Sequence, residues 1–161
     1  MSTGLTPEQV WEVIEKQNFG VLGMVSAKDE ARTVGIVYIL GDRRLYIGTW
    51  TSMWKVRHVK QNPHVSVTIP IHRRVPFMPW IKVPAATITF NGEADVIAAL
   101  DAPRELLEKL YHGVASDEQE MARYSLIEVT PIGDFLTYGI GMSVLDMRDP
   151  QKARQRVPVG G

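Results

Sequence analysis

The chain has 161 residues, with 18 Lys and Arg against 18 Asp and Glu and no cysteine. This length fits one ordinary domain, which buries roughly two-thirds of the surface of its unfolded chain. The balanced charge excludes the overall field that attracts nucleic acid or an acidic membrane surface. The lack of cysteine excludes disulfides, iron–sulfur clusters and thiolate metal sites.

The N-terminal sequence gives expectations about location. Residues 1–16 lack a basic segment followed by an apolar one, so we expect no signal peptide. No apolar run approaches the roughly 18 residues that a membrane helix needs. We therefore expect a cytoplasmic protein that binds neither membrane nor nucleic acid.

The first half of the chain predicts a helix followed by strands with short connections. Thr6 and Pro7 are typical of a helix start, and apolar residues recur at helical spacing to about Lys16. Beyond it, apolar residues alternate with polar ones or run continuously between turn residues. The strands predicted here are 19–26, 32–40 and 45–49, with a fourth at 65–69 after a short helix that Asn62-Pro63 ends.

The second half predicts a long strand, a helical insertion and two final strands. Residues 85–97 favour a strand in which Asn91-Gly92 marks a turn or a bulge. A helix is predicted from residues 101–103 to about His112, and residues 116–123 continue the helical pattern. The last elements predicted are strands at 124–130 and 134–141 and a polar tail at 146–161.

These elements predict a mainly β protein with small helices. About six antiparallel strands favour a closed barrel over an open sheet, because closure removes exposed strand edges. We therefore expect one barrel domain over residues 1–145, followed by the tail at 146–161.

The stretch 45–63 has the features of a phosphate site. A strand leads into a helix, and Thr51 and Ser52 at the junction are typical N-cap residues. Lys55 follows in the first turn. Backbone N–H groups, the positive end of the helix dipole, hydroxyls and a lysine together bind phosphate. The alternative is ordinary capping beside a solvated lysine, since such caps occur at many helices.

The order of elements from Glu8 to Gly141 resembles the pyridoxamine 5'-phosphate oxidase-like split-barrel family. The likeness rests on an early strand arginine, a strand that ends in threonine, a Ser/Thr-x-x-Lys helix start before Asn-Pro, and a glycine-containing strand at 90–94. It implies an antiparallel split β-barrel and a homodimer with FMN at the subunit interface. Some branches of the family bind a deazaflavin coenzyme or haem instead.

Carried over residue by residue, the resemblance implies a cofactor site on both sides of the strand–helix junction. Arg32 and Lys55 contact the phosphate, while the backbone of Thr33 and Val34 runs beside the flavin ring. Trp50 either stacks on a ring or packs in the core, whereas core packing is the preferred interpretation of Trp54. The cofactor-binding residues implied are Arg32, Thr33, Val34, Thr49, Trp50, Thr51, Ser52 and Lys55.

Departures from the family pattern argue against oxidation of pyridoxamine phosphate itself. Val37 replaces a second basic residue, Met53 replaces a common serine, and Trp54 replaces a common arginine. Residues 135–146 lack the Arg-x-His element that binds the oxidase's substrate. We therefore expect a different small-molecule substrate and a hydride transfer for which the cofactor supplies the redox chemistry.

The sequence leaves the proton donor and two alternative functions open. Tyr38, Tyr46 and Tyr138 are equal candidates for the donor. One alternative is a deazaflavin-dependent reductase on the same fold; the other is a stress-type protein that holds flavin or haem without turnover. The four histidines lack metal-ligand spacing, so no metal site is expected, and a haem ligand is disfavoured.

Residues 72–84 predict a long structured loop, because Pro76, Pro79 and Pro84 forbid regular ladders. The loop nevertheless carries several large apolar side chains. We expect it to pack across a dimer partner, with a wall over the cofactor as the alternative. Its basic residues, Arg73, Arg74 and Lys82, meet an anionic ligand or remain solvated.

Overall fold

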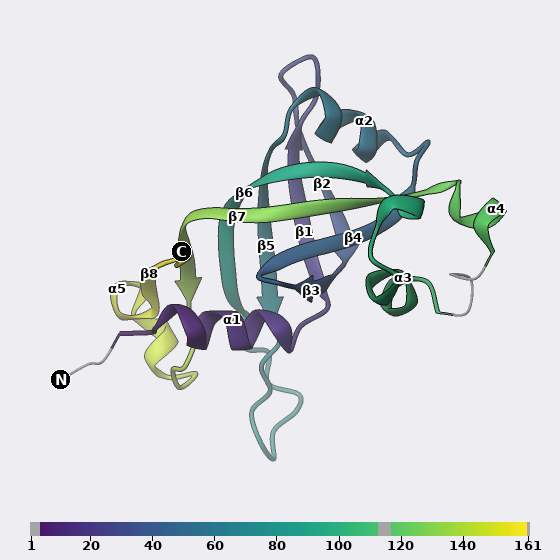
Figure 1. The fold of residues 1–161 in the computed structure, drawn as a ribbon. Helices are drawn as coiled ribbons and strands as arrows, with labels where there is room; N and C mark the ends of the chain where they lie inside the picture. Colours follow the sequence, from purple (N-terminus) through teal and green to yellow (C-terminus); the bar gives the residue numbers. More distant parts are fainter. Residues whose placement is uncertain (1–3, 113–116, 161) are drawn as a thin grey trace.

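The computed structural model describes residues 4–112 and 117–160, which form one antiparallel sheet and several small helices (Figure 1). The strands are β1 Phe19–Val25, β2 Ala31–Val37, β3 Ile39–Gly41, β4 Arg44–Trp50, β5 His64–Ile71, β6 Ala86–Ala98, β7 Tyr124–Tyr138 and β8 Arg154–Pro158. The α-helices are α1 Pro7–Glu15, α2 Trp54–Gln61, α3 Arg104–Leu110, α4 Glu118–Met121 and α5 Pro150–Ala153. The 3-10 turns are η1 Ala99–Asp101 and η2 Asp146–Arg148.

The sheet curls until its two ends meet. Its strand order is β2-β1-β5-β6-β7-β4-β3, with β8 added to β7. The end strands, β2 and β3, follow one another in sequence with only Tyr38 between them. Because β2 and β3 are joined by a single residue, the two edges of the sheet lie next to each other and the sheet closes into a barrel. This confirms the predicted split β-barrel.

Tyr38 explains why the predicted strand 32–40 is divided in two. Its side chain is fully buried, and its hydroxyl donates to the backbone oxygen of Ile14 on α1 at 2.8 Å. Burial raises the pKa of this phenol above its usual value. The change of direction at Tyr38 thus joins the barrel wall to α1.

The prediction of two final strands at 124–130 and 134–141 is wrong, because β7 is one continuous strand. Asn91 pairs with Ile132 but Thr89 pairs with Leu136, so β7 carries extra residues opposite Phe90. The turn alternative for Asn91-Gly92 is wrong, because β6 is continuous there. The irregularity lies one residue earlier, and its extra residues are on β7, while Asn91 and Gly92 keep regular partners. Gly92 itself is required by close packing, since a Cβ atom would lie 2.7 Å from a methyl carbon of Val129.

The tail expected at 146–161 is instead structured over the described residues 146–160. It forms η2, α5 and β8, and β8 pairs with β7 from Asp134 to Tyr138. Val157 is buried in the core, and the oxygen of Val159 accepts a hydrogen bond from the Trp11 ring nitrogen at 3.0 Å. These long-range contacts explain why a polar segment with little sequence preference for a strand is nevertheless an ordered part of the domain.

The remaining predicted elements agree with the structure. The helix from Thr6 is α1, with a capping box between Thr6 and Gln9. The helices expected to about His112 and over 116–123 are the shorter α3 and α4, and residue 116 lies outside the described residues. No helix within 4–112 or 117–160 is long and apolar enough to cross a membrane.

The interior contains two apolar clusters. The larger fills the barrel, and Val10, Trp11 and Ile14 of α1 cover one end of it. The smaller lies between β4 and the helical insertion, where Tyr46 packs with Leu107 and other buried residues. At the opposite end of the barrel from α1 lies α2 (Figure 1).

Candidate functional site

The junction between β4 and α2, residues Thr49–Lys55, is called the α2 corner below. The helix begins at Trp54 with Met53 as its N-cap residue, and no side chain within the described ranges caps it with a hydrogen bond. The prediction that Thr51 or Ser52 caps α2 is therefore wrong. The first backbone N–H groups of α2, at the positive end of the helix dipole, are therefore left available to a ligand.

Thr51 does not cap the helix because its polar groups are used elsewhere. Its hydroxyl lies 2.8 Å from that of Ser125, and its N–H donates to the oxygen of Arg123 at 2.9 Å. The N–H of Met53 then donates to the oxygen of Trp50, which closes a turn before the helix. The corner is thus fastened to β7, while Ser52 remains exposed.

Lys55 lies in the first turn of α2 as a half-buried cation. None of the ion pairs among residues 4–112 and 117–160 includes it. Burial lowers its pKa, because the charged form loses hydration without gaining a partner. One turn further along, Nδ1 of His58 is buried and makes no hydrogen bond in the described structure. These unsatisfied groups fit a site for an anionic group.

The back of the corner is held by the helical insertion. Thr49 is buried and pairs with Ser125 in the β4–β7 ladder. The hydroxyl of Tyr111 donates to the oxygen of Ser125 at 3.2 Å, and burial raises the pKa of Tyr111 to about 12. Tyr111 comes this close only because residue 48 is glycine, where a Cβ would lie 2.7 Å from the phenol oxygen.

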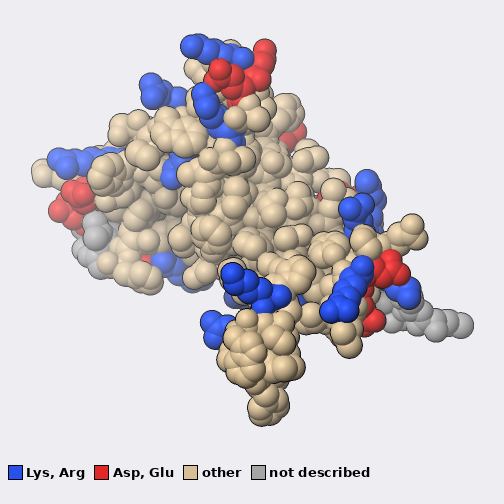
Figure 2. Space-filling model, turned by 180° about the vertical axis from the view of Figure 1, so that it is seen from behind, with Lys and Arg blue, Asp and Glu red and all other residues tan. Residues whose placement is uncertain are grey.

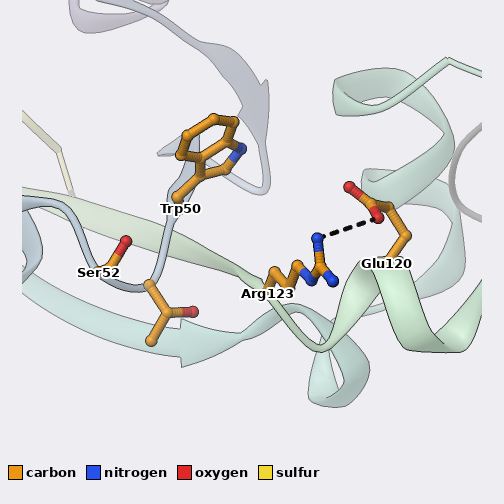
Figure 3. A pocket seen from close by; sticks show the side chains of 5 residues that line it. Trp50, Ser52, Glu120 and Arg123 are labelled. Carbon is orange, nitrogen blue, oxygen red and sulfur yellow. Dashed lines mark ion pairs between the residues drawn. The ribbon is translucent and has the colours of Figure 1, made fainter.

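In front of the corner lies an open pocket of about 440 Å³, lined by Trp50, Thr51, Ser52, Glu120 and Arg123 (Figure 3). Trp50 is 57% exposed, and it lies on the other face of β4 from the buried Thr49, as strand alternation predicts. Tyr124 supports it edge-on, with ring centres 6.4 Å apart. Arg123 and Glu120 form a 3.9 Å ion pair on the other side of the pocket (Figure 3). The pocket therefore combines a flat apolar surface with a loosely paired cation.

Arg32 and Thr33 lie in a different depression, a groove of about 490 Å³ across the outside of the barrel. Thr33 begins a row of laterally paired residues that continues through Gly23, Ser66 and Asn91 to Ile132. The guanidinium of Arg32 lies 2.6 Å from the carboxylate of Glu30, so its charge is already partly neutralised.

The structure thus gathers only some of the predicted site residues. Trp50, Thr51 and Ser52 line one pocket, while Arg32 and Thr33 line the groove. Lys55, on α2, lines neither the pocket nor the groove. Val34 packs against the core, on the other face of β2 from Thr33.

Sequence reasoning missed the residues that complete the pocket, Glu120 and Arg123, and those that anchor it, Tyr111 and Ser125. They follow the corner by about 60–75 residues, and no motif spacing links the two segments. The β4–β7 pairing, in which Trp50 lies opposite Tyr124, brings them together. The core interpretation of Trp54 is confirmed, since its ring packs against the barrel cluster.

Comparisons with known proteins agree with this fold. The sequence profile of the family described as pyridoxamine 5'-phosphate oxidase matches residues 6–133. Among curated proteins, none matches the chain.

Several solved structures share the fold at low identity. HutZ, the heme storage protein from Vibrio cholerae, matches 85% of this chain and 98% of its own, with 12% identity and a TM-score of 0.64. An FAD-binding protein from Mesorhizobium loti matches 79% of this chain and 88% of its own, with 15% identity and a TM-score of 0.57. An F420 reductase matches 77% of this chain and 93% of its own, with 18% identity and a TM-score of 0.53.

Proposed function

Because the chain belongs to the pyridoxamine 5'-phosphate oxidase family, we propose that it is a flavin-dependent oxidoreductase that binds FMN at the α2 corner. The substrate is a small molecule other than pyridoxamine phosphate, in keeping with Val37, Met53 and Trp54 at positions where the oxidase carries polar or basic residues. The observation that carries the proposal is the uncapped start of α2 next to Lys55, a half-buried cation without a carboxylate partner among residues 4–112 and 117–160.

The α2 corner suits the phosphate end of FMN. A phosphate there accepts hydrogen bonds from the first N–H groups of α2 and from the hydroxyl of Ser52. It also gives Lys55 an electrostatic partner, which this lysine lacks within the described part of the chain. FMN supplies the hydride chemistry when bound, while the protein binds, orients and shields it from water. The exposed indole of Trp50 offers a flat surface for a conjugated ring.

A homodimer is part of the proposal, because a broad outer face of the barrel is uncharged. The outward residues of β1, β2 and β5, and those of β6 as far as Asn91, include no Asp, Glu, Lys or Arg, whereas Glu93 and Asp95 follow further along β6. Several large apolar side chains are exposed among these residues and on β7. The uncharged area is visible in Figure 2. The exposed apolar residues on this face are Phe19, Val37, Ile132 and Leu136. A contiguous face of this kind suits a second copy of the chain.

The test is a comparison of FMN with riboflavin, which differs only in lacking the phosphate. Titration followed by flavin fluorescence is expected to give FMN at least about tenfold tighter binding, the effect of charge-assisted hydrogen bonds to phosphate. Purified protein with flavin absorption bands would support the same conclusion. Equal affinity for FMN and riboflavin would overturn the phosphate assignment.

Two other cofactors are included as outcomes of the same titration. Binding of a deazaflavin coenzyme but not FMN would keep the fold and change the enzyme to a deazaflavin-dependent reductase. Binding of haem alone, with a Soret band, would replace the oxidoreductase by a haem carrier.

Sedimentation velocity tests the proposed dimer. A charge on the uncharged face (Val37→Glu) should dissociate the dimer, whereas the matched Leu100→Glu on η1 should not.

A further inference from the structure

Residues 72–85 form a finger that projects from the barrel end opposite α2 (Figure 1). Two successive turns shape it, with N–H donation from Met78 to Val75 at 3.2 Å and from Ile81 to Met78 at 3.1 Å. Phe77 is 96% exposed and Trp80 73% exposed at its tip. Large aromatic side chains in water at a projecting tip indicate an interaction surface.

A cavity of about 510 Å³ lies between the finger and residues 144–148. This volume is within the roughly 300–1,000 Å³ of small-molecule pockets. Its walls are mostly apolar, and the base of the finger is held by a hydrogen bond from Arg73 to the oxygen of Met142. The lining side chains used below are Val75, Met78 and Ile81 from the finger and Leu145 and Met147 from the facing segment.

Two cations, Lys82 and Arg148, also line this cavity, and Arg73 and Arg74 stand at the base of the finger. No aspartate or glutamate occurs between residues 72 and 92. The carboxylates of the facing segment are engaged elsewhere. Asp146 accepts from the hydroxyl of Ser143 at 2.6 Å, and Asp149 lies 3.8 Å from Lys152. Figure 2 shows that the end of the finger is free of charged side chains, while basic residues lie at its base.

We propose that this cavity binds an anionic amphiphile, with its apolar chain between the finger and Leu145 and its headgroup at Lys82 and Arg148. An apolar wall with cations at its rim matches both parts of such a molecule. A second copy of the finger is a poorer occupant, because it would bring its own cations against these. The site is independent of the α2 corner, which lies at the other end of the barrel.

The first experiment is calorimetric titration of the full chain with dodecanoate below its micelle concentration. Dodecyltrimethylammonium serves as the probe of opposite charge. We expect dodecanoate to bind at least about tenfold more tightly, because a charge-assisted contact to Arg148 or Lys82 favours only the anion. Equal binding of both probes, or binding of neither, would overturn the proposal.

Variants then locate the binding. Leu145→Glu places a carboxylate on an exposed lining position, and Arg148→Gln removes one cation; each is expected to weaken dodecanoate binding by about tenfold or more. The matched controls, Leu100→Glu and Arg104→Gln, change exposed residues of the helical insertion and should leave binding unchanged. Unaltered thermal unfolding of each variant confirms its fold. Loss of binding in the controls, or none in Leu145→Glu, would contradict the assignment.

A vesicle assay distinguishes the two sources of such a ligand. Co-sedimentation with vesicles containing phosphatidylglycerol but not with pure phosphatidylcholine, competed by dodecanoate, identifies a membrane lipid as the source. Dodecanoate binding without vesicle binding identifies a free amphiphile. A dimer that Leu145→Glu dissociates, in a protein that does not bind dodecanoate, would instead assign the cavity to a second copy and overturn the proposal.

Discussion

The two helices at opposite ends of the barrel, α1 and α2, differ in how completely their polar groups are satisfied. At α1 the start is closed by a capping box, the Trp11 ring nitrogen bonds to Val159, and the Tyr38 hydroxyl bonds to Ile14. At α2 no side chain caps the start, Lys55 lacks an ion pair in the described structure, and Nδ1 of His58 has no partner.

This difference separates stability from function. Satisfied buried groups stabilise the fold, whereas unsatisfied ones cost free energy unless a ligand completes them. The α1 end therefore closes the core, and the α2 end leaves polar groups unsatisfied at the proposed cofactor site. Substitutions at the two ends should accordingly change different measured quantities.

The largest effect is expected from Trp11→Ala at the α1 end. The Trp11 side chain is buried, packs edge-on against Phe135 with ring centres 5.1 Å apart, and donates a hydrogen bond to the oxygen of Val159. Its removal should lower the free energy of unfolding by about 3–5 kcal/mol in urea denaturation. Trp50→Ala, which removes an exposed ring, should cost less than ~1 kcal/mol. Similar costs for both would remove the contrast between the two ends.

Lys55→Met should affect ligand binding and stability in opposite directions. Loss of the charge is expected to weaken FMN binding by ~1.5–3 kcal/mol, or roughly 10–150-fold. The ligand-free protein should unfold at a melting temperature higher by roughly 1–4 °C, because the cost of burying an unpaired cation disappears. Fluorescence titration and differential scanning calorimetry measure the two effects.

Lys60→Met is the matched control, since Lys60 is exposed on the same helix. It should change neither quantity appreciably. If Lys55→Met bound FMN as tightly as the unaltered chain, the phosphate would have to lie away from the α2 corner.

The two helix starts can be compared through their hydroxyls. Thr6→Ala removes the cap of α1, whose hydroxyl accepts from Gln9, and should cost ~1 kcal/mol in unfolding free energy. Ser52→Ala should cost almost nothing in the ligand-free protein, because Ser52 caps no helix. An equal loss in both variants would show that Ser52 caps α2 in solution.

The smallest effect is a pH dependence of opposite sign at the two ends. The pKa of Lys55 is lowered from 10.5, so the unfolded chain binds more protons and stability rises with pH up to 10.5. The pKa of Tyr38 is raised from 10.0, so its contribution is complete below pH 10.0 and is lost as pH rises above it.

Urea denaturation between about pH 8 and about pH 11 tests these signs, with each group limited to about 1.4 kcal/mol per pH unit. Lys55→Met should remove the rise, and Tyr38→Phe should remove part of the fall. A Lys55→Met variant with the same rise as the unaltered chain would mean that another group causes it.

Charge is distributed in a way that the net value conceals. Residues 43–92 contain no aspartate or glutamate, although the whole chain is neutral. Both the α2 corner and the finger belong to this segment, at opposite ends of the barrel. The two proposed anion sites are therefore compatible with a neutral chain, because screened electrostatic effects are local.

The sequence by itself determined the local elements and much of their chemistry. Period-two patterns predicted β4 and β5, a near-continuous apolar run predicted β1, and Thr6-Pro7 predicted the start of α1. These signals depend on neighbours within a few residues. The position of Lys55 at the start of a helix that follows a strand was also readable, and so was the resemblance to the family.

Only the tertiary structure decided which groups are satisfied and which residues meet. Thr51 has an ideal capping side chain but bonds to Ser125, which lies 74 positions later. The polar residues after Asp149 form a strand because β7 offers them a free edge. Both outcomes depend on pairing between distant segments, and local sequence preferences do not encode that pairing.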